Sequence, residues 1–360
     1  MVETLTMEDL ISRWDGETVA THRDRRTGTW MFVCAHSFHL GRAAGGTRMK
    51  PYATPAAGLA DGLRLAEAMT LKFAAADLPQ GGGKAVIALP SATLPAGEER
   101  RRLLREFGSF VTSLGGLFSC APDMNTSSVD MDVIAEVCPY VFCKTEAAGG
   151  HGDTAPDTAV GVLHGIRASC AYALGSDDLS GRTVVVQGAG GVGGRLVELL
   201  TAAGATAIAS DVNAARLEQL GRSGVATVSA ADALSTSCDV LAPCATGGVI
   251  NAASIDQLRC RIVAGAANNQ LEEPDDANRL TARGILYAPD FVINAGGVLH
   301  GAGLEVLGWS REELDRRLVG VGDTLREIFE SAERQGISTD TAARRLAGTR
   351  LAAPPRSSGR

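Results

Sequence analysis

Lys84 is the first residue whose type and surroundings suggest chemistry. It follows three glycines in LPQGGGKAVIALP, residues 78–90, and leads directly into an apolar stretch. Glycines before a lysine resemble a phosphate-binding loop, but that loop needs GxxxxGK followed by Ser or Thr. Here Leu78 stands where its first glycine would be, and Ala85 follows the lysine. The sequence therefore predicts an ammonium group at the start of a strand, beside backbone that a ligand can approach closely.

Lys72 lies on the apolar side of a predicted helix. Thr54 and Pro55 are typical of an N-cap and a first turn, so we expect a helix from there to about Lys72. Leu65 and Met69 precede Lys72 at helical spacing, which places the lysine on their apolar stripe. An inward lysine must be paired, neutral or bound to a ligand, whereas a lysine at a helix end can extend its head group to water. Spacing alone leaves both interpretations open.

A carboxylate follows in the polar loop of SCAPDMNTSSVDMDVIAEVC, residues 119–138. This segment predicts a strand end, a loop that contains Asp123, and a helix that begins near Ser127 or Ser128. Loop carboxylates are usually solvated or cap a helix, and binding residues are also common on loops. Position alone makes Asp123 a candidate without assigning it a role.

The second half of the chain carries a dinucleotide-binding signature. TVVVQGAGGVGGRLVELLTAAGATAIASDV predicts a strand, a glycine turn, a helix and a second strand that ends at Asp211. Gly188, Gly190 and Gly193 have the GxGxxG spacing, which permits a tight turn, close approach to a pyrophosphate and close helix–strand packing. Asp211 would bind the adenosine ribose hydroxyls and repel a 2′-phosphate, which favours NAD over NADP. A methyltransferase would also use a glycine-rich first turn, but this spacing suits a dinucleotide better.

Further short apolar runs end in small or amide residues, as in CDVLAPCA, RIVAGAANN and GILYAPDFVINAGG. The carboxyl ends of parallel strands share one edge of a sheet, where ligands bind. Asn268, Asn269 and Asn294 would therefore gather around the nicotinamide. Asparagine is also a common turn former, so each of these residues has a purely structural alternative.

Composition limits the class of protein. A chain of 360 residues is long enough for two domains. The formal charge of −7 and the lack of a Lys/Arg block argue against a nucleic-acid partner. The eight cysteines form no CxxC pair, so we expect buried reduced thiols and no metal site. Without a signal peptide or an apolar stretch long enough to span a membrane, the sequence predicts a cytoplasmic protein.

Seven motifs give the chain a resemblance to the glutamate/leucine/phenylalanine/valine dehydrogenases, and to their amino-acid branch in particular. They cover nearly the whole length in the order of that family. The motifs are LGRAAGGTRM (40–49), AEAMTLKFAAADLPQGGGK (66–84), APDMNTSSVDMD (121–132), GAGGVGG (188–194), APCATGG (242–248), GAANNQL (265–271) and RGILYAPDFVINAGG (283–297). The resemblance implies oxidative deamination of an L-amino acid to a 2-oxo acid and ammonia, with NAD as cofactor.

The resemblance also implies roles for individual residues. Lys84 matches the catalytic lysine that activates water as a general base, and Asp123 matches the acid that exchanges protons with the substrate amino group. Lys72 matches the lysine that binds the substrate carboxylate, together with the Gly46 backbone and Asn268. Burial beside Lys72 would lower the pKa of Lys84 towards a range useful for base catalysis, and the neighbouring glycines would leave room for the substrate. The implied NAD-binding residues are Gly188, Gly190, Gly191, Val192, Gly193, Asp211, Ala245, Asn268 and Asn294.

The substrate is expected to be phenylalanine or another aromatic amino acid. Ala44 stands where the branched-chain members carry leucine in LGPALGG, and Gly301 stands where the family commonly has Val or Leu. Both changes enlarge the expected side-chain pocket, which Val298 also lines, and EVLGW at 305–309 resembles the phenylalanine branch. No lysine replaces Ala44 to hold a γ-carboxylate, which disfavours glutamate. Arg42 replaces the family proline of LGPA, with an effect on this loop that the sequence leaves open.

Two alternatives remain, and a third is disfavoured. One is a leucine or valine dehydrogenase with a rearranged pocket, and another is a catalytically silent NAD-binding regulator. A hydroxy-acid dehydrogenase would need a catalytic histidine. His36, His39 and His300 lie in plausible regions, but none has an evident carboxylate partner in the sequence, so we expect structural or surface roles for them.

The expected architecture is α/β with two domains and an active site in the cleft between them. Residues 1–146 should form a substrate-binding and oligomerisation domain with a mixed sheet, and 147–324 an NAD-binding Rossmann domain. Residues 325–360 are expected to return to the first domain and to end in a disordered tail, LAAPPRSSGR. The resemblance implies a homo-oligomer, a dimer or an octamer, whose small-molecule partners are the amino acid, the oxo acid and ammonia.

Overall fold

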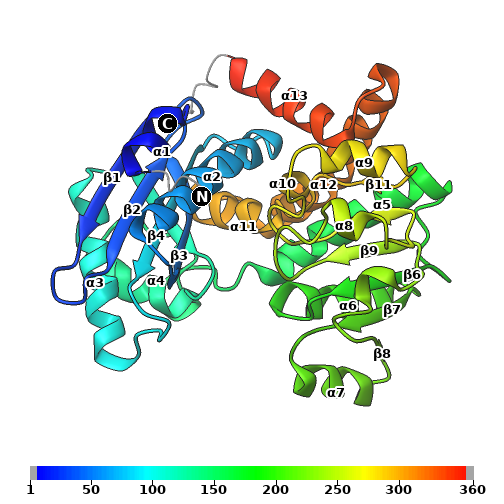
Figure 1. Ribbon diagram of the computed structural model, residues 1–360, viewed down its shortest axis with the longest axis horizontal. Coiled ribbons are helices and arrows are strands. Elements are labelled where there is room, and N and C mark those ends of the chain that lie inside the picture. The colour runs from blue at the N-terminus through cyan, green and yellow to red at the C-terminus, as the bar shows by residue number, and fades with distance from the viewer. Residues whose placement is uncertain (1–5, 354–360) are drawn as a thin grey trace. The chain divides into compact units, whose positions relative to one another are not determined.

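The structure, a computed structural model, describes residues 6–353, which divide into two compact units. The first unit takes the chain up to Asp153, with Glu305–Leu307 and the chain from Arg350, and the second takes Thr154–Leu304 and Gly308–Thr349 (Figure 1). Most of the expected tail LAAPPRSSGR, from residue 354 on, lies outside the described residues. Within those residues, no helix is long and apolar enough to cross a membrane.

The division between the units differs from the predicted limits. The first unit extends to Asp153 instead of residue 146, because the Gly152 N–H donates to the Lys144 carbonyl at 3.0 Å and folds this stretch back on itself. Residues 325–349, which were expected to return to the first domain, belong to the second unit.

Helix packing explains the second difference. α12 (Arg311–Gln335) packs along α5 (Ala155–Leu174) within the second unit, where the Tyr172 and Phe329 rings are 5.2 Å apart. After α12, the chain returns to the first unit at Arg350, near the end of α13 (Thr339–Ala352). The Arg350 guanidinium donates to the Ala74 carbonyl at 3.3 Å.

The first unit contains the mixed sheet that the sequence predicts. Its strands are β1 (Thr18–Arg23), β2 (Trp30–Ala35), β3 (Ala43–Pro51), β4 (Gly81–Leu89) and β5 (Phe118–Pro122). They lie in the order β1-β2-β4-β3-β5, with β1, β2 and β4 antiparallel and β3 parallel to both β4 and β5. The helices are α1 (Met7–Arg13), α2 (Pro55–Ala75), α3 (Gly97–Ser113), α4 (Ser128–Ala135) and the 3₁₀ turn Glu146–Ala148.

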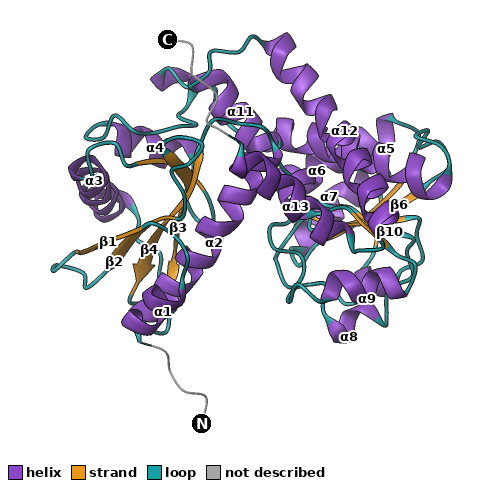
Figure 2. Cartoon of the chain, turned by 90° about the horizontal axis from the view of Figure 1, so that it is seen from above, coloured by secondary structure: helices purple, strands orange, loops and turns teal. Residues whose placement is uncertain are grey.

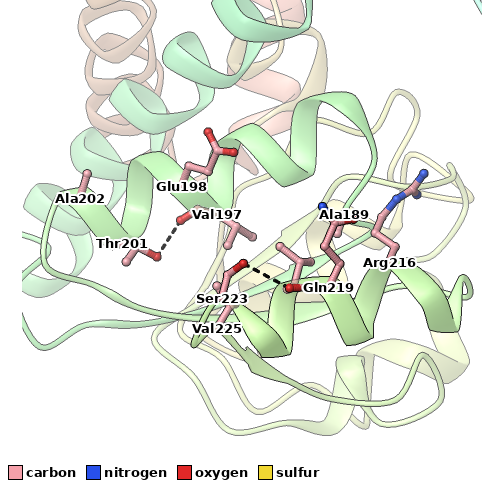
Figure 3. Close-up of a pocket in the computed structure, with 10 residues that line it drawn as sticks. Ala189, Val197, Glu198, Thr201, Ala202, Arg216, Gln219, Ser223 and Val225 are labelled. Carbon is pink, nitrogen blue, oxygen red and sulfur yellow. Dashed lines mark hydrogen bonds between the residues drawn. The ribbon is translucent and has the colours of Figure 1, made fainter.

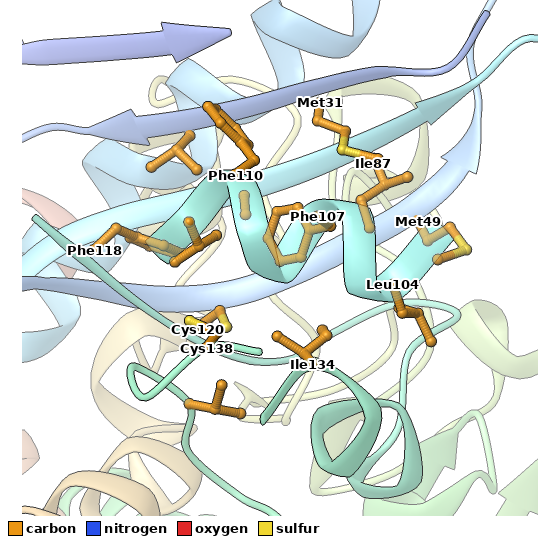
Figure 4. Packing of buried hydrophobic residues seen from close by; sticks show 14 of the residues in the cluster. Met31, Met49, Ile87, Leu104, Phe107, Phe110, Phe118, Cys120, Ile134 and Cys138 are labelled. Carbon is orange, nitrogen blue, oxygen red and sulfur yellow. The ribbon is translucent and has the colours of Figure 1, made fainter. Parts of the chain in front are cut away.

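The two faces of this sheet carry different side chains because neighbouring strand residues point to opposite sides. One face packs Met31, Met49 and Ile87 against α3 and α4 in an apolar core (Figure 4). α2 covers the opposite face, with Val86 and Ala88 beneath it, so α3 and α2 lie on either side of the sheet (Figure 2). Lys84 has the same parity along β4 as these two residues and therefore lies on the α2 face.

The second unit is a Rossmann fold, as predicted. β6 (Thr183–Gln187), β7 (Thr206–Ser210), β8 (Ala226–Thr227), β9 (Val240–Pro243), β10 (Ile262–Val263) and β11 (Leu286–Tyr287) form a parallel sheet in the order β11-β10-β9-β6-β7-β8. Besides α5, α12 and α13, the helical segments are α6 (Gly191–Ala202), α7 (Ala214–Arg222), the 3₁₀ turn Ala233–Ser235, α8 (Ala252–Ile255), α9 (Asp276–Ala282), α10 (Asp290–Ile293) and α11 (Gly296–Glu305). The strand order reverses between β6 and β9, which is where such sheets bind dinucleotides.

Candidate active site

Lys84 and Asp123 form a buried ion pair in the first unit. Lys84 is 5% exposed, and its Nζ lies 3.2 Å from Oδ2 of Asp123. Asp123 follows directly on β5, and Thr126 in the same loop fixes it by accepting from its N–H at 2.8 Å. The Thr126 hydroxyl also contacts the Thr47 carbonyl of β3 at 2.8 Å. The carboxylate is thus held by the adjacent parallel strand as well as by its own.

Arg48 of β3 joins this pair. Its Nε donates to Oδ2 of Asp123 at 2.7 Å, and its Nη1 donates to Oδ2 of Asp61 on α2 at 3.1 Å. The Tyr52 hydroxyl donates to the same Asp61 oxygen at 2.6 Å. Two cations and two carboxylates therefore form one network beneath α2.

The charges of this network shift its pKa values. Burial lowers the pKa of Lys84, the Asp123 carboxylate opposes that effect, and the Arg48 guanidinium lowers it further. Burial alone would raise the pKa of Asp123, but Lys84 and Arg48 together hold it well below its ordinary value. Asp123 is thus an ionised carboxylate, and Lys84 is a lysine with an increased tendency to lose its proton. The Arg48 guanidinium is a cation beside Lys84 that the sequence analysis did not name.

Gly46 stands directly against the pair. A Cβ added there would lie 2.7 Å from Asp123 Cβ and 3.1 Å from Lys84 Nζ, so only glycine fits at this point. Lys72 is buried on α2, and Ala44, two residues before Gly46 on β3, is 1% exposed. The predicted residues Lys84, Asp123 and Gly46 are therefore in contact, and Lys72 and Ala44 belong to the elements that surround them.

The glycines before Lys84 accommodate the protein's own atoms. A Cβ on Gly82 would lie 2.0 Å from Oγ1 and 2.2 Å from the backbone nitrogen of Thr70, and a Cβ on Gly83 would lie 3.0 Å from the Phe118 ring. A Cβ on Gly81 would meet the Ser37 carbonyl oxygen at 2.1 Å. The expectation that these glycines leave room for substrate is therefore wrong, because they allow close packing of α2, β5 and the β2–β3 loop on β4.

Two of the three candidate histidines have carboxylate partners that the sequence did not indicate. His36 contacts Asp15 at 3.1 Å through Nε2, and His300 contacts Asp157 at 2.6 Å through Nδ1. Their partners come from distant parts of the chain, so no local motif could indicate these pairs. His39 instead contacts the Ala353 carbonyl at 3.2 Å.

In the second unit, the three motif glycines have distinct surroundings. Gly188 has φ +97° and makes the turn after β6. A Cβ on Gly193 would lie 1.9 Å from the Gly188 carbonyl oxygen, so this glycine permits close helix–strand packing. A Cβ on Gly190 would have no atom of the described residues within 4 Å. Gly190 is the N-cap of α6 and has no side-chain cap, so the first turn presents N–H groups to an anion.

Asp211 lies beside this turn, at the end of β7. Its carboxylate accepts from the backbone N–H groups of Ala189 at 2.9 Å and Asn213 at 2.8 Å, and from Arg216 at 3.1 Å. Burial opposes ionisation of Asp211, but these donors hold its pKa below the ordinary value. Ala245, which follows β9, lies against Gly188, because a Cβ on that glycine would be 2.6 Å from Ala245 Cβ. Gly191 and Val192 form the first turn of α6.

Two of the three predicted amides, Asn268 and Asn294, are in contact. Nδ2 of Asn294 donates to Oδ1 of Asn268 at 3.0 Å and to the Ala266 carbonyl at 3.1 Å. Asn294 is 5% exposed, and its Oδ1 accepts no hydrogen bond from the part of the chain that the structure describes. A buried acceptor of this kind requires a donor.

Comparison with known proteins gives the same family over most of the chain. The family model Glu/Leu/Phe/Val dehydrogenase, dimerisation domain, matches residues 19–140, and Glutamate/Leucine/Phenylalanine/Valine dehydrogenase matches residues 211–359. The leucine dehydrogenase of Thermoactinomyces intermedius is 39% identical over 344 residues, 95% of this chain and 93% of the relative. The chain belongs to the Glu/Leu/Phe/Val dehydrogenase family.

Two further relatives have different names. The phenylalanine dehydrogenase of T. intermedius is 38% identical over 346 residues, 95% of this chain and 93% of that protein. The crystal structure of L-tryptophan dehydrogenase from Nostoc punctiforme superposes with a TM-score of 0.78 at 37% identity, over 96% of this chain and 98% of that one. These identities are too similar to distinguish the substrate. Membership of the Glu/Leu/Phe/Val dehydrogenase family makes the chain an amino-acid dehydrogenase that deaminates an L-amino acid oxidatively.

NAD is the cofactor of this family, and the second unit of the dehydrogenase fits it. The open backbone at Gly190 can approach a pyrophosphate, and Asp211 lies where ribose hydroxyls are bound. Oδ1 of Asn294 is an acceptor suited to a carboxamide N–H such as that of nicotinamide.

A cavity of about 600 Å³ lies between α6 and α7 of the dehydrogenase (Figure 3). It includes Ala189 of the glycine turn and Arg216, the partner of Asp211. The other lining residues are Val197, Glu198, Thr201, Ala202, Gln219, Leu220, Ser223 and Val225. The cavity therefore adjoins the Asp211 end of the glycine turn.

The expected substrate residues of the second unit lie on α11. Val298 is half-buried and Gly301, one turn later, is buried. His300 on the same helix is fixed by Asp157, which Arg311 also contacts through both guanidinium Nη atoms at 2.9 and 2.6 Å.

Sequence reasoning missed Arg48 and its partner Asp61. Arg48 lies within the recognised motif LGRAAGGTRM, on a strand whose preceding residues Ala43–Thr47 are small and buried. A charged residue in a buried strand must be paired, and this signal would have identified it. Asp61 gives no such signal, because helix α2 also carries charged residues that face solvent.

Proposed function

We propose that this dehydrogenase acts on L-phenylalanine or another aromatic L-amino acid, with NAD as the hydride acceptor. The observation that carries the proposal is small residue size at two positions that the family resemblance assigns to the side-chain pocket. Ala44 stands where branched-chain members carry leucine, and Gly301 stands where Val or Leu is common. Filling apolar volume drives binding, and a remaining void penalises a small side chain.

A leucine or valine dehydrogenase is the second candidate. It is favoured by the 39% identity to the leucine dehydrogenase of T. intermedius. Overall identity reports mostly on the shared fold, whereas substrate choice depends on a few pocket residues. The small size of Ala44 and Gly301 is therefore a stronger indication of the substrate than overall identity.

The family resemblance and the contact between Lys84 and Asp123 support the following chemistry for the first unit. Lys72 and the Gly46 backbone bind the substrate carboxylate, and the ionised Asp123 accepts a proton from the substrate ammonium group. NAD, held by the glycine turn and Asp211 of the second unit, would supply the acceptor for the α-carbon hydride, whose loss converts the amine to an imine. Lys84, in its neutral form, removes a proton from the water that attacks the imino carbon. Asp123 then returns its proton to the amino nitrogen, the added hydroxyl loses its proton to solvent, and cleavage of the C–N bond releases ammonia and the 2-oxo acid.

The first experiment measures NADH formation from L-Phe, L-Tyr, L-Trp, L-Leu, L-Val and L-Glu, with Lys84→Ala as control. We expect aromatic substrates to give the highest kcat/KM and Lys84→Ala to lose turnover with all of them. A higher kcat/KM for Leu or Val would overturn the aromatic assignment and leave the mechanism intact. Silence on every substrate, with NADH still bound, would identify a non-catalytic NAD-binding protein.

We also propose that the dehydrogenase is a homo-oligomer in a reducing compartment. Residues 19–140 match a family model described as a dimerisation domain, which supports self-association. All eight cysteines are free thiols, six of them buried, which supports a cytoplasmic location. Light scattering coupled to size exclusion gives the number of subunits, and a monomeric mass would contradict this part.

A further inference from the structure

Arg48 connects two carboxylates that lie on different elements. Its side chain is 11% exposed and lies between Asp123, after β5, and Asp61, on α2. Nε contacts the first carboxylate at 2.7 Å and Nη1 contacts the second at 3.1 Å. A planar guanidinium held at two of its nitrogens has a fixed orientation, which a lysine could not reproduce.

Arg48 and Lys84 bond the same oxygen. Oδ2 of Asp123 accepts from Arg48 Nε and lies 3.2 Å from Lys84 Nζ. The two nitrogens are therefore within about 6 Å of each other, a distance at which a like charge disfavours protonation. The charge of Asp123 is divided between a permanent cation and a titratable one.

We propose that Arg48 is the positioning residue of the Lys84–Asp123 pair. It fixes the carboxylate beside the lysine, and it takes up enough of the Asp123 charge to let Lys84 release its proton. This inference rests on the proposed function, in which neutral Lys84 is the general base. Arg48 itself does not contact the reacting atoms.

Asp61 fixes the far end of Arg48. Its Oδ2 accepts from Nη1 of Arg48 and from the Tyr52 hydroxyl at 2.6 Å, and its Oδ1 accepts from Arg64 at 2.9 Å. Lys50 Nζ lies 3.9 Å from the same carboxylate. Arg64 is half-exposed and contacts Asp61 alone in this network, which makes it a matched control for the removal of a cation.

The other charged groups near Lys84 determine the direction in which its pKa changes when the Arg48 charge is removed. The titratable and charged groups around Lys84 are Arg48, Lys50 and Tyr52 from β3 and its end, Asp61, Arg64 and Lys72 from α2, Asp123 from the β5 loop, and Cys34 from β2. Burial and Arg48 lower the pKa of Lys84, whereas Asp123 and Asp61 raise it. Removal of the Arg48 charge leaves Asp123 to Lys84 alone, so the lysine keeps its proton to higher pH.

The test compares Arg48→Met, Arg48→Lys and Arg64→Met by the pH dependence of kcat/KM for oxidative deamination. The acid limb of the profile is the pH range in which kcat/KM rises as Lys84 loses its proton. In Arg48→Met, this limb should move to higher pH by about one unit or more, because a nearby like charge is lost. In Arg48→Lys, the limb should stay near its wild-type position while kcat falls about tenfold or more, because the charge remains and the two-point geometry is lost. Arg64→Met should match wild type in both.

An acid limb that stays in place in Arg48→Met, or that moves equally in Arg64→Met, would overturn the inference. If Arg48 had only a structural role, Arg48→Met and Arg48→Lys would both lose thermal stability. Their pH profiles of kcat/KM would then not differ from each other. If Arg48→Met does not fold, the charge-balanced pair R48M/D61N replaces it and should still move the limb upward. Retained turnover in Lys84→Ala would overturn the proposed function itself, whereas lost turnover there with an unmoved limb in Arg48→Met overturns only the role of Arg48.

Discussion

Gly46 lies against Lys84 so closely that a single methyl group on the glycine would stand 3.1 Å from the lysine Nζ. The same methyl would lie 2.9 Å from the Pro122 carbonyl oxygen, so the site has no space for it. The backbone of β3 is thus in direct contact with the Lys84–Asp123 pair.

Asp123→Asn should move the acid limb of kcat/KM in the opposite direction to Arg48→Met. The Asp123 charge raises the pKa of Lys84, so its removal lets the lysine lose its proton at lower pH. At the same time, kcat should fall by about 10² to 10⁴, because the amide cannot accept the ammonium proton. Initial rates of NADH formation between acid and alkaline pH measure both effects. A limb that moves upward would contradict the assigned pairing.

Ala44→Leu should shift the preference from aromatic to branched-chain substrates. The added carbons would occupy volume that the proposal assigns to an aromatic ring, and such changes alter discrimination by about 10- to 200-fold. The ratio of kcat/KM for Phe to that for Leu measures the shift. Because Ala44 is 1% exposed, thermal unfolding of the variant must accompany the kinetics. An unchanged ratio in a folded variant would remove Ala44 from the pocket.

Gly190→Ala and Gly193→Ala should separate cofactor binding from folding. At Gly190 a methyl would meet no atom of residues 6–353 within 4 Å, so stability should remain while NADH affinity falls about tenfold or more. At Gly193 the methyl would lie 1.9 Å from the Gly188 oxygen, which should cost about 1–3 kcal/mol or more. Fluorescence titration with NADH and thermal unfolding test this pair. Normal NADH binding by Gly190→Ala would contradict the assigned pyrophosphate site.

Gly82→Ala should lower the free energy of unfolding of the first unit, because the added methyl would clash with protein atoms. Its methyl would lie 2.2 Å from the Thr70 backbone nitrogen, which no rotamer change can relieve, and overpacking of this kind costs about 1–3 kcal/mol. Gly320→Ala within α12 is the matched control, because its methyl would meet no described atom within 4 Å. That variant should gain about 0.5–1 kcal/mol from helix propensity. Chemical denaturation compares the two, and equal stabilities would contradict the packing role of Gly82.

The sequence predicted the elements whose signals are local. Thr54 and Ser127 cap α2 and α4 as expected, and the glycine turn between β6 and α6 lies where its motif placed it. Asp123 was assigned to the site only through the family resemblance, and its contact with Arg48 was missed, because the two residues come from separate strands that meet through parallel pairing. The unit against which α12 packs was not predictable from its amphipathic pattern. Such a pattern indicates that one face of the helix is buried, but it does not identify the surface that covers that face.

β3 carries Ala44, Gly46 and Arg48 at alternate positions, and it pairs with both β4 and β5. Insertions or deletions are therefore unequally tolerated along this chain. The loss of one residue within β3 would turn Arg48 into the apolar core and bring Met49 to the charged network, because every side chain would change face. The turn between β1 and β2, which ends in Gly28, lies outside this constraint. Length variation among related enzymes should thus be absent from β3 and tolerated at that turn.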